Sequence, residues 1–547
     1  MKRNLFLLFL VSLRIQAFCI DYSVDTTFVS NKRYINFPVI GTGHQSIMRL
    51  SVNGKVVNSF YINLAPEKPD YWVYYEAMEL QDKTVTITYE GNDDRGIHYI
   101  FQSDNFVGED SLYKERLRPQ VHFSTKRGTT GDANGMIYID GEYHMFFQHS
   151  PYGPGPRDMH WGHAISSDLL HWKQLHDALA PDDLGEIYSG SAVIDHNNTA
   201  GFGKNAMVAI YTNDKDKPHH VEVQSLAYSN DKGRTWTKYE NNPVMDINEE
   251  AKTVHTRDPK VFWHEPTECW VMVLFVMPGF NIYTSPNLKE WTYQSRIEGF
   301  HECPELFPLA VDGDKNNIKW VMYDVRSNYM IGDFDGKVFT PQTPILKYRT
   351  GPQGACQSFN NIPISDGRRI QTGSAHTVFD RSSFNSMMAL FSEVTIRTTP
   401  NGLRLFNYPI KEYEKLHMQG KRLSGTADEV NAGLKEFKST NPVRIKAKVK
   451  FNSPLGSQLS YNGQPIVKFD FKINDLMAYD LYPQQAVKIT LDIIIDRTSI
   501  ETFVDQGRYS YLIVRDRNPA KKDGLIFSGE NIEIESLEIY PLKSIWK

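Results

Sequence analysis

The chain has 547 residues, with 40% hydrophobic residues, 23% charged residues and a formal net charge of −5. This length exceeds one ordinary hydrophobic core, so two or three domains are expected. The composition is that of a globular protein, and the small negative charge argues against a nucleic-acid or membrane-surface partner. Aromatic residues make up 12% of the chain, a high share that suits β-rich folds or sugar-binding clefts.

Residues 1–19 are predicted to be a signal peptide. Lys2 and Arg3 precede the apolar run LFLLFLVSL, which is too short to span a bilayer comfortably; a buried first strand is the alternative. Cys19 stands where a lipid-attachment cysteine can follow a signal, although Phe18 is bulky where such sites favour small residues, so a lipid anchor is left open. The other cysteines are too far apart to suggest a disulfide framework or a zinc cluster. We expect an exported protein (periplasmic, cell-surface or extracellular) without a membrane span in the mature chain.

Alternating apolar and polar residues dominate the rest of the chain. Examples are KVVNSFYINL, TVTITYEG, RIKAKVKF and KITLDIIIDRTSIETFV, and Asn-Gly or Asp-Gly turn signals separate such runs. Helical periodicity is nearly absent, apart from the segment NYPIKEYEKLHM at 407–418. The pattern predicts an all-β protein.

A tryptophan-containing motif repeats in the middle of the chain. SSDLLHWKQL, SNDKGRTWTKY and SPNLKEWTYQ each place a tryptophan after Ser and an Asp or Asn, at Trp172, Trp236 and Trp291. A period of about 55 to 65 residues with such a signature indicates propeller blades; three unrelated hairpin turns are the alternative.

These patterns divide the chain into parts with soft boundaries. We expect an N-terminal sandwich-like β domain at 20–115, a β-propeller at 116–408, a linker at 409–424 and a C-terminal β-sandwich at 425–547. A propeller gathers the inner strands of its blades around one axis, so acids that are distant in sequence can face one cavity.

Three acids fit that arrangement. Asp132 lies in GTTGDANG, Asp258 in HTRDPKVFW and Glu302 in HECPELFPL, each beside Gly or Pro and next to a predicted strand. Taken singly, each acid is better explained as a turn acid or a member of a surface ion pair. Together they indicate glycoside hydrolysis, which needs one carboxylate as nucleophile and another carboxyl group to protonate the leaving oxygen.

The segments around these acids resemble glycoside hydrolase family 32, the invertases, levanases and inulinases. The resemblance runs from Arg118 to the end, through RPQVHFSTKRGTTGDANGMIYIDGEYHMFFQHSPYG, MHWGHAISSDLLHW, IYSGSAVIDHNNTAGFG, TRDPKVFW, HECPELFPL and DRTSIETFV. It implies a five-bladed β-propeller followed by a β-sandwich. The region before about residue 115 is more weakly similar to an extra β domain of some gut-bacterial members, and a bacterial source is favoured.

The resemblance also implies roles for the site residues. Asp132 corresponds to the nucleophile, Glu302 to the acid/base and Asp258 to the acid that grips fructose hydroxyls and stabilises the transition state, kept charged by its neighbour Arg257. No metal and no organic cofactor is implied. Residues expected to contact the sugar are Asn134, Gln148, Ser189, Ser191, Arg257 and His301; for the two serines, a purely structural turn is the alternative.

The chain departs from the family around the same cavity. Where the family usually reads Trp-Met-Asn-Asp-Pro-Asn-Gly, this chain reads TTGDANG. Aromatic residues of the family are further replaced at Pro156, Thr256, His301, Gly354 and Ser374. Since the three acids are retained while aromatic residues around the cavity are replaced, we interpret the pocket as reshaped rather than inactive.

Three functions remain open on the sequence alone. The first is a hydrolase that releases fructose or short oligosaccharides from the fructans levan or inulin. The second is the same retaining chemistry with changed specificity, either internal cleavage of levan or transfer of fructosyl to another sugar. The third is a non-catalytic fructan-binding protein.

Overall fold

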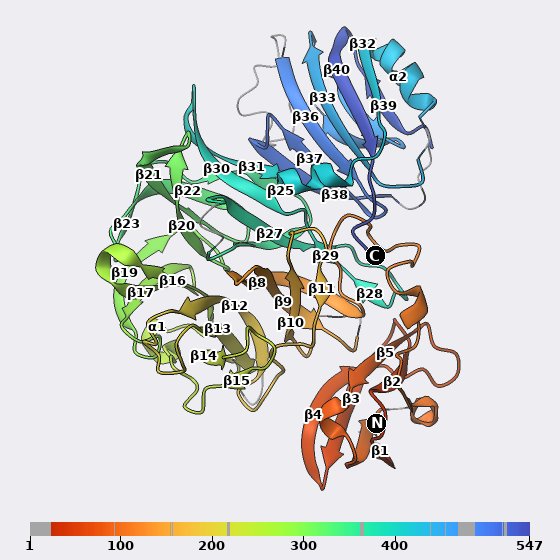
Figure 1. The fold of residues 1–547 in the computed structure, drawn as a ribbon, viewed down its shortest axis with the longest axis vertical. Coiled ribbons are helices and arrows are strands. Elements are labelled where there is room, and N and C mark those ends of the chain that lie inside the picture. The colour runs from red at the N-terminus through yellow and green to blue at the C-terminus, as the bar shows by residue number, and fades with distance from the viewer. Residues whose placement is uncertain are drawn as a thin grey trace, which may run out of the picture.

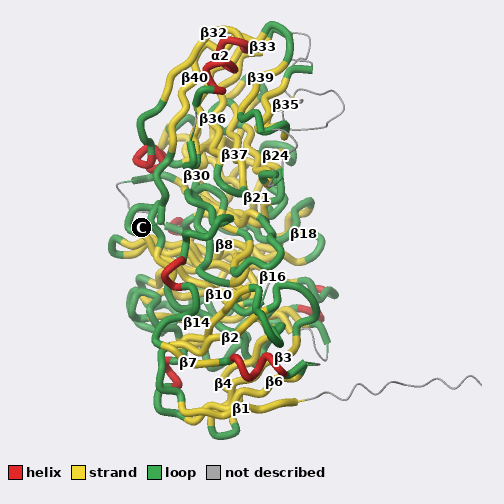
Figure 2. The backbone as a smooth tube through the Cα atoms, turned by 90° about the vertical axis from the view of Figure 1, so that its right-hand side faces the viewer, coloured by secondary structure: helices red, strands yellow, loops and turns green. Residues whose placement is uncertain are grey.

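The computed structural model describes residues 23–546 except 92, 154, 156, 216–218, 362–365, 438, 454–455, 469–486, 517 and 519–521. The predicted signal peptide, Cys19 and Pro156 lie outside the described residues. The described chain is built mainly of strands in three stacked parts (Figure 1), and the turned view in Figure 2 shows the same stack from the side. The predicted all-β class is confirmed. No helix in this described portion is long and apolar enough to cross a membrane.

Two sheets form the N-terminal part. One sheet has the order β1 (Ser23–Val29), β6 (Thr84–Glu90), β3 (Ser46–Val52) and β4 (Lys55–Ile62), and the other β5 (Tyr71–Glu76), β2 (Tyr34–Val39) and β7 (Phe101–Ser103). Their alternate side chains enclose an apolar core, which also takes in Tyr152 from the propeller. The Tyr152 ring stacks on Phe60 with centroids 3.8 Å apart. The module is thus anchored to the loop that follows the second propeller strand.

Five four-stranded blades form the propeller within the described residues. The first blade consists of β8 (Gly128–Ile139), β9 (Glu142–Ser150), β10 (His160–Ser166) and β11 (Lys173–Gln174), and the second of β12 (Glu186–Asp195), β13 (Ala206–Lys215), β14 (Val221–Ser229) and β15 (Thr237–Lys238). The third blade consists of β16 (Thr256–His264), β17 (Cys269–Val276), β18 (Gly279–Ser285) and β19 (Thr292–Glu298). The fourth consists of β20 (Glu305–Val311), β21 (Asp314–Tyr323), β22 (Asn328–Phe334) and β23 (Phe339–Pro341), and the fifth of β26 (Gln353–Ser358), β27 (Arg369–Ala375), β30 (Ser392–Thr399) and β31 (Gly402–Pro409). Middle strands are covered on both faces, which is why β17 reads CWVMVLFV without alternation.

A short parallel pairing closes the ring. β28 (Phe384–Asn385) follows the second strand of the last blade and pairs with the start of β8, with Phe384 opposite Gly128. The Gly128 amide also donates to the Ser383 carbonyl at 2.8 Å. The last blade therefore holds the strand that carries Asp132.

A two-sheet sandwich follows the propeller. Its larger sheet has the order β25 (Arg349–Thr350), β38 (Tyr509–Val514), β37 (Ser499–Val504), β36 (Val487–Ile495), β33 (Val443–Phe451), β40 (Ile532–Pro541) and β32 (Lys421–Thr426), and the smaller β35 (Gln464–Lys468), β34 (Gln458–Tyr461) and β39 (Leu525–Ser528). Short β24 (Leu346–Lys347) and β29 (Met387–Met388) pair with the propeller strands β22 and β27.

A buried ionic group joins the propeller to the sandwich. The His122 ring lies 2.8 Å from an Asp496 oxygen and 3.0 Å from a Glu501 oxygen. Although burial works against its charge, these hydrogen bonds raise the pKa of His122 to about 9. The alternating motif DRTSIETFV thus packs the sandwich against the propeller.

One helix was not anticipated from the sequence. α2 (Ala427–Lys435) begins at Thr426, whose hydroxyl accepts from the Glu429 amide while the Glu429 carboxylate accepts from the Thr426 amide. This Thr-x-x-Glu capping box was the available signal. The predicted helical segment at 407–418 is only a 3-10 turn over Lys411–Leu416, and α1 (Asn248–Ala251) is a single turn.

Candidate active site

The three predicted acids lie at the same end of the propeller's inner strands. Asp132 is near the start of β8, Asp258 is near the start of β16, and Glu302 lies three residues before the start of β20. The ladders of β8 and β16 are interrupted at these acids, and Asp258 (φ 64°) and Glu302 (φ 40°) have left-handed backbone. Such interruptions turn side chains out of the regular alternation, and they are common beside functional sites.

The Asp132 carboxylate is held by the last blade. Its Oδ1 accepts hydrogen bonds from the Ala355 amide at 3.0 Å and from the Ser374 hydroxyl at 2.6 Å. Burial raises the pKa of Asp132 above its usual range; these two bonds and nearby His376 oppose the rise, and the charge of Glu302 adds to it. Asp132 and Glu302 are therefore close enough to influence one another electrostatically.

Asp258 is almost completely buried beside Cys303. Its Oδ2 accepts from the Cys303 amide at 3.0 Å, and its own amide donates to the Thr212 hydroxyl at 2.9 Å. Burial raises the pKa of Asp258 to about 7, against the opposing charge of Arg257. Desolvation thus works against the expectation that Arg257, whose guanidinium is 3.9 Å away, keeps this acid charged.

Arg257 instead joins two glutamates. Its guanidinium lies 2.7 Å from Glu222 and 2.5 Å from Glu302. The Nδ1 atom of His301 is 3.4 Å from the same Glu302 oxygen, and the His301 ring stacks on Phe275. Glu222, which the sequence analysis did not identify, thus fixes the arginine that contacts Glu302.

The remaining predicted sugar contacts separate into two groups. Asn134 and Ser189 line a small cavity together with Asp258 and Cys303, and the Gln148 amide donates to the Ser189 hydroxyl at 3.0 Å. Ser191, in contrast, is fully buried and bridges two blades, donating to the Pro259 carbonyl at 2.9 Å and accepting from the Val261 amide at 2.8 Å. The prediction that Ser191 contacts sugar is not supported by this placement.

The positions where aromatic residues are missing do not all line the site. Thr256 is fully buried and its hydroxyl donates to the Glu222 carbonyl at 3.0 Å, so it is not a pocket wall. Gly354 lies directly against the nucleophile candidate, where a Cβ atom would overlap Oδ1 of Asp132 and Oγ of Ser374. Two of the replacements therefore change the immediate surroundings of Asp132.

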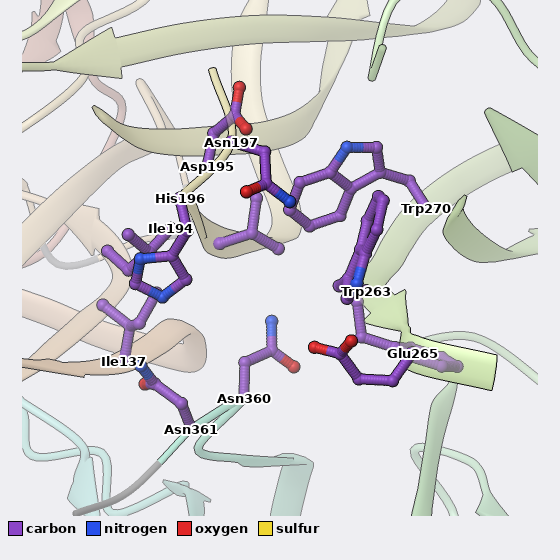
Figure 3. Close-up of a pocket in the computed structure, with 12 residues that line it drawn as sticks. Ile137, Ile194, Asp195, His196, Asn197, Trp263, Glu265, Trp270, Asn360 and Asn361 are labelled. Carbon is purple, nitrogen blue, oxygen red and sulfur yellow. The ribbon is translucent and has the colours of Figure 1, made fainter. Parts of the chain in front are cut away.

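A larger cavity, of about 530 Å³, lies at the opposite ends of the inner strands (Figure 3). Ile137, Ile194 and Trp263 line it, near the last residues of β8, β12 and β16, together with Asn360 and Asn361 after β26. It contains none of the three acids. This cavity and the three acids therefore lie at opposite ends of the inner strands.

One group of described side chains has the composition of a cation site. Single ligand atoms of Asp214, His220 and Glu222 lie within 4.8 Å of one another. Their charges already have protein partners, because His220 contacts Asp214 at 2.7 Å and Arg257 contacts Glu222 at 2.7 Å. The group behaves as an ion-pair network behind Arg257.

Comparisons with known proteins identify the family of the chain. A family model described as the glycosyl hydrolases family 32 N-terminal domain matches residues 122–409. A levanase of Bacillus subtilis (strain 168) is 38% identical over 501 residues, covering 80% of this chain and 72% of the levanase. An extracellular exo-inulinase of Aspergillus niger is 29% identical, over 79% of this chain and 96% of its own length.

Solved structures of an exo-inulinase and a β-fructofuranosidase are similar in fold to this chain. An exo-inulinase from Aspergillus awamori superposes with a TM-score of 0.65 at 26% identity, covering 79% of this chain and all of the inulinase. A β-fructofuranosidase from Schwanniomyces occidentalis, complexed with fructosyl-erythritol, superposes with a TM-score of 0.66 at 26% identity, covering 80% of this chain and 99% of its own.

Proposed function

Because the chain belongs to glycosyl hydrolase family 32, we propose that it is a retaining glycoside hydrolase that cleaves β-fructofuranosidic bonds in fructans. The observation that carries this proposal is the meeting of Asp132, Asp258 and Glu302 at one end of three inner strands. The names of the relatives, a levanase and exo-inulinases, support fructans as the substrate class.

In the proposed reaction, an oxygen of Asp132 attacks the anomeric carbon of a fructosyl unit. The bond between that carbon and the leaving oxygen breaks, and the Glu302 carboxyl gives its proton to the leaving oxygen. Water then attacks the fructosyl-enzyme and loses a proton to Glu302, which releases Asp132 and restores the acid. Arg257 and Glu222 hold Glu302 in place through the contacts described above.

Asp258 is proposed to bind fructose hydroxyl groups. A buried carboxyl whose pKa lies near 7 can donate or accept a hydrogen bond, depending on its protonation. Ser189 and Asn134, which share its small cavity, are proposed to bind the same sugar unit, with Gln148 acting beside Ser189. His301, stacked on Phe275, would contact sugar from the side of Glu302.

A second mode of action is favoured by the residues around Asp132. Gly354 and Ser374 stand where the family usually has aromatic residues, and the space beside Gly354 is taken up by the Asp132 carboxylate and the Ser374 hydroxyl. Internal cleavage of levan, or fructosyl transfer, is the alternative that the loss of these aromatic rings supports.

Incubation with levan, inulin and sucrose, with products resolved by chain length, tests the function. Fructose alone indicates end-wise cleavage, a ladder of oligomers indicates internal cleavage, and larger products indicate transfer. Asp132→Asn and Glu302→Gln should each lower kcat/KM by roughly 10³-fold, since both groups act on the breaking bond. If the parent binds fructan but turns over none of the three substrates, the protein is a binding module instead.

Export is also proposed. The basic start and short apolar run at residues 1–19 have the form of a signal peptide, and the exo-inulinase relative is named extracellular. Mass spectrometry of the mature N-terminus in a bacterial host tests this proposal, and it also detects lipid on Cys19. An intact N-terminus on protein that stays inside the cell would contradict export.

A further inference from the structure

The hydrogen bonds to Asp132 are unevenly divided between its two carboxylate oxygens. Oδ1 receives both protein donors, the Ala355 amide and the Ser374 hydroxyl. In the described part of the chain, Oδ2 has no hydrogen-bond partner. One oxygen is therefore fixed, and the other keeps its lone pairs free.

The local backbone of the last blade creates both donors. The ladder between β26 and β27 is regular at Gln353 and again at Cys356 but is interrupted between them. Gly354 and Ala355 lie in this interruption, so the Ala355 amide points away from the ladder and toward Asp132. Gly354 has no side chain, and this absence leaves the space in which the carboxylate and the Ser374 hydroxyl meet.

Ser374 is well suited to hold a side chain in place. It is fully buried, and its backbone pairs with Met388 of β29. A hydroxyl bound to a carboxylate in such a site fixes the carboxylate rotation, and it stabilises the charged form. A nucleophile gains rate when its attacking atom is already aimed before the substrate arrives.

Resting on the proposed function, we infer that Ser374 is a positioning residue for the nucleophile. Together with the Ala355 amide, it fixes Oδ1 of Asp132, so that Oδ2 is the atom that attacks the anomeric carbon. The family usually has tryptophan at the position of Ser374. In this chain the aromatic ring is thus replaced by a hydroxyl that donates a hydrogen bond to the nucleophile.

This role predicts a specific change in pH dependence. Asp132 must be ionised to attack, so kcat/KM rises with pH through its pKa. Without the Ser374 donor, the charged carboxylate loses a stabilising hydrogen bond, and its pKa rises. The acid limb of the pH profile should therefore move to higher pH by about one unit.

The test compares Ser374→Ala and Ser374→Thr with a matched control, Ser358→Ala. Ser358 is also fully buried in the last blade, and it also donates to a buried carboxylate, Glu305, at 2.6 Å. Ser374→Ala should lower kcat by roughly 10- to 100-fold with little change in KM. It should also shift the acid limb, whereas Ser374→Thr should retain the acid limb of the parent. Ser358→Ala should keep the parental profile.

Crystal structures of the parent and of Ser374→Ala give a readout that does not depend on turnover. The Asp132 carboxylate should rotate or become disordered in the variant. An unmoved carboxylate, or an acid limb in Ser374→Ala that matches the parent, would overturn the positioning role. A parent that is inactive on every fructan would instead refute the proposed function, and the crystal structures would still decide the role of Ser374.

Discussion

Replacing Asp258 with asparagine should stabilise the fold and remove activity. The carboxyl has an ordinary pKa of 3.8, which we take for the unfolded chain, and a pKa of about 7 in the folded protein. As pH rises from 3.8 to 7, the unfolded state gives up this proton before the folded state, so the free energy of unfolding falls. Between pH 5 and pH 8 the loss spans about two pKa units, which corresponds to about 3 kcal/mol. Asparagine has no proton to lose, so the variant avoids this cost.

Urea unfolding of the parent and of Asp258→Asn, followed by tryptophan fluorescence at pH 5 and pH 8, measures the effect. The advantage of the variant should be about 3 kcal/mol larger at pH 8 than at pH 5, while fructan hydrolysis is lost. Asp523→Asn, a change at an exposed acid, controls for the general effect of removing a negative charge. An advantage that is equal at the two pH values would refute the reasoning from burial.

Two further changes probe other parts of the structure. Gly354→Ala should lower kcat at least 100-fold because the new methyl group overlaps the Asp132 carboxylate; thermal unfolding should change by only a few degrees, and an unchanged kcat would contradict this geometry. His122→Gln should destabilise the protein by about 3 kcal/mol at pH 6, because it leaves two buried carboxylates without their cation. The pKa of His122 is raised from 6.5 to about 9, so its contribution is complete below pH 6.5 and disappears as pH rises through 9. The loss in free energy of unfolding should therefore be small at pH 10. Urea unfolding of the parent and the variant at pH 6 and pH 10 measures it, and an equal loss at the two pH values would contradict this reasoning.

The fold class could be predicted because alternation is a local property. Residues such as those in TVTITYEG specify a strand whatever their partners are, and the tryptophan turns lie between the third and fourth strands of the first three blades. The helix after Thr426 was missed because it is short and its capping box lies in a chain otherwise dominated by strand patterns. Local patterns thus predicted the main elements and missed the exception.

The sequence identifies the three candidate acids but not the residues that surround them. Short motifs single out Asp132, Asp258 and Glu302, but the partners of these acids come from other blades. Neither the bond from Ser374 nor the contact between Glu222 and Arg257 is marked by any sequence spacing. Likewise, the pKa of Asp258 depends on how completely the fold removes water, which adjacency to an arginine does not reveal.

Because β28 pairs with the start of β8, the candidate active site depends on segments from distant parts of the chain. Asp132 leaves the ribosome early, yet the hydroxyl that binds it lies 242 residues later in the chain, and β28, which secures the start of β8, comes later still. A nascent chain that ends before β28 contains Asp132 but lacks the strand that pairs with the start of β8. A substitution that breaks the pairing between Phe384 and Gly128 can therefore lower activity, although it lies outside the candidate active site.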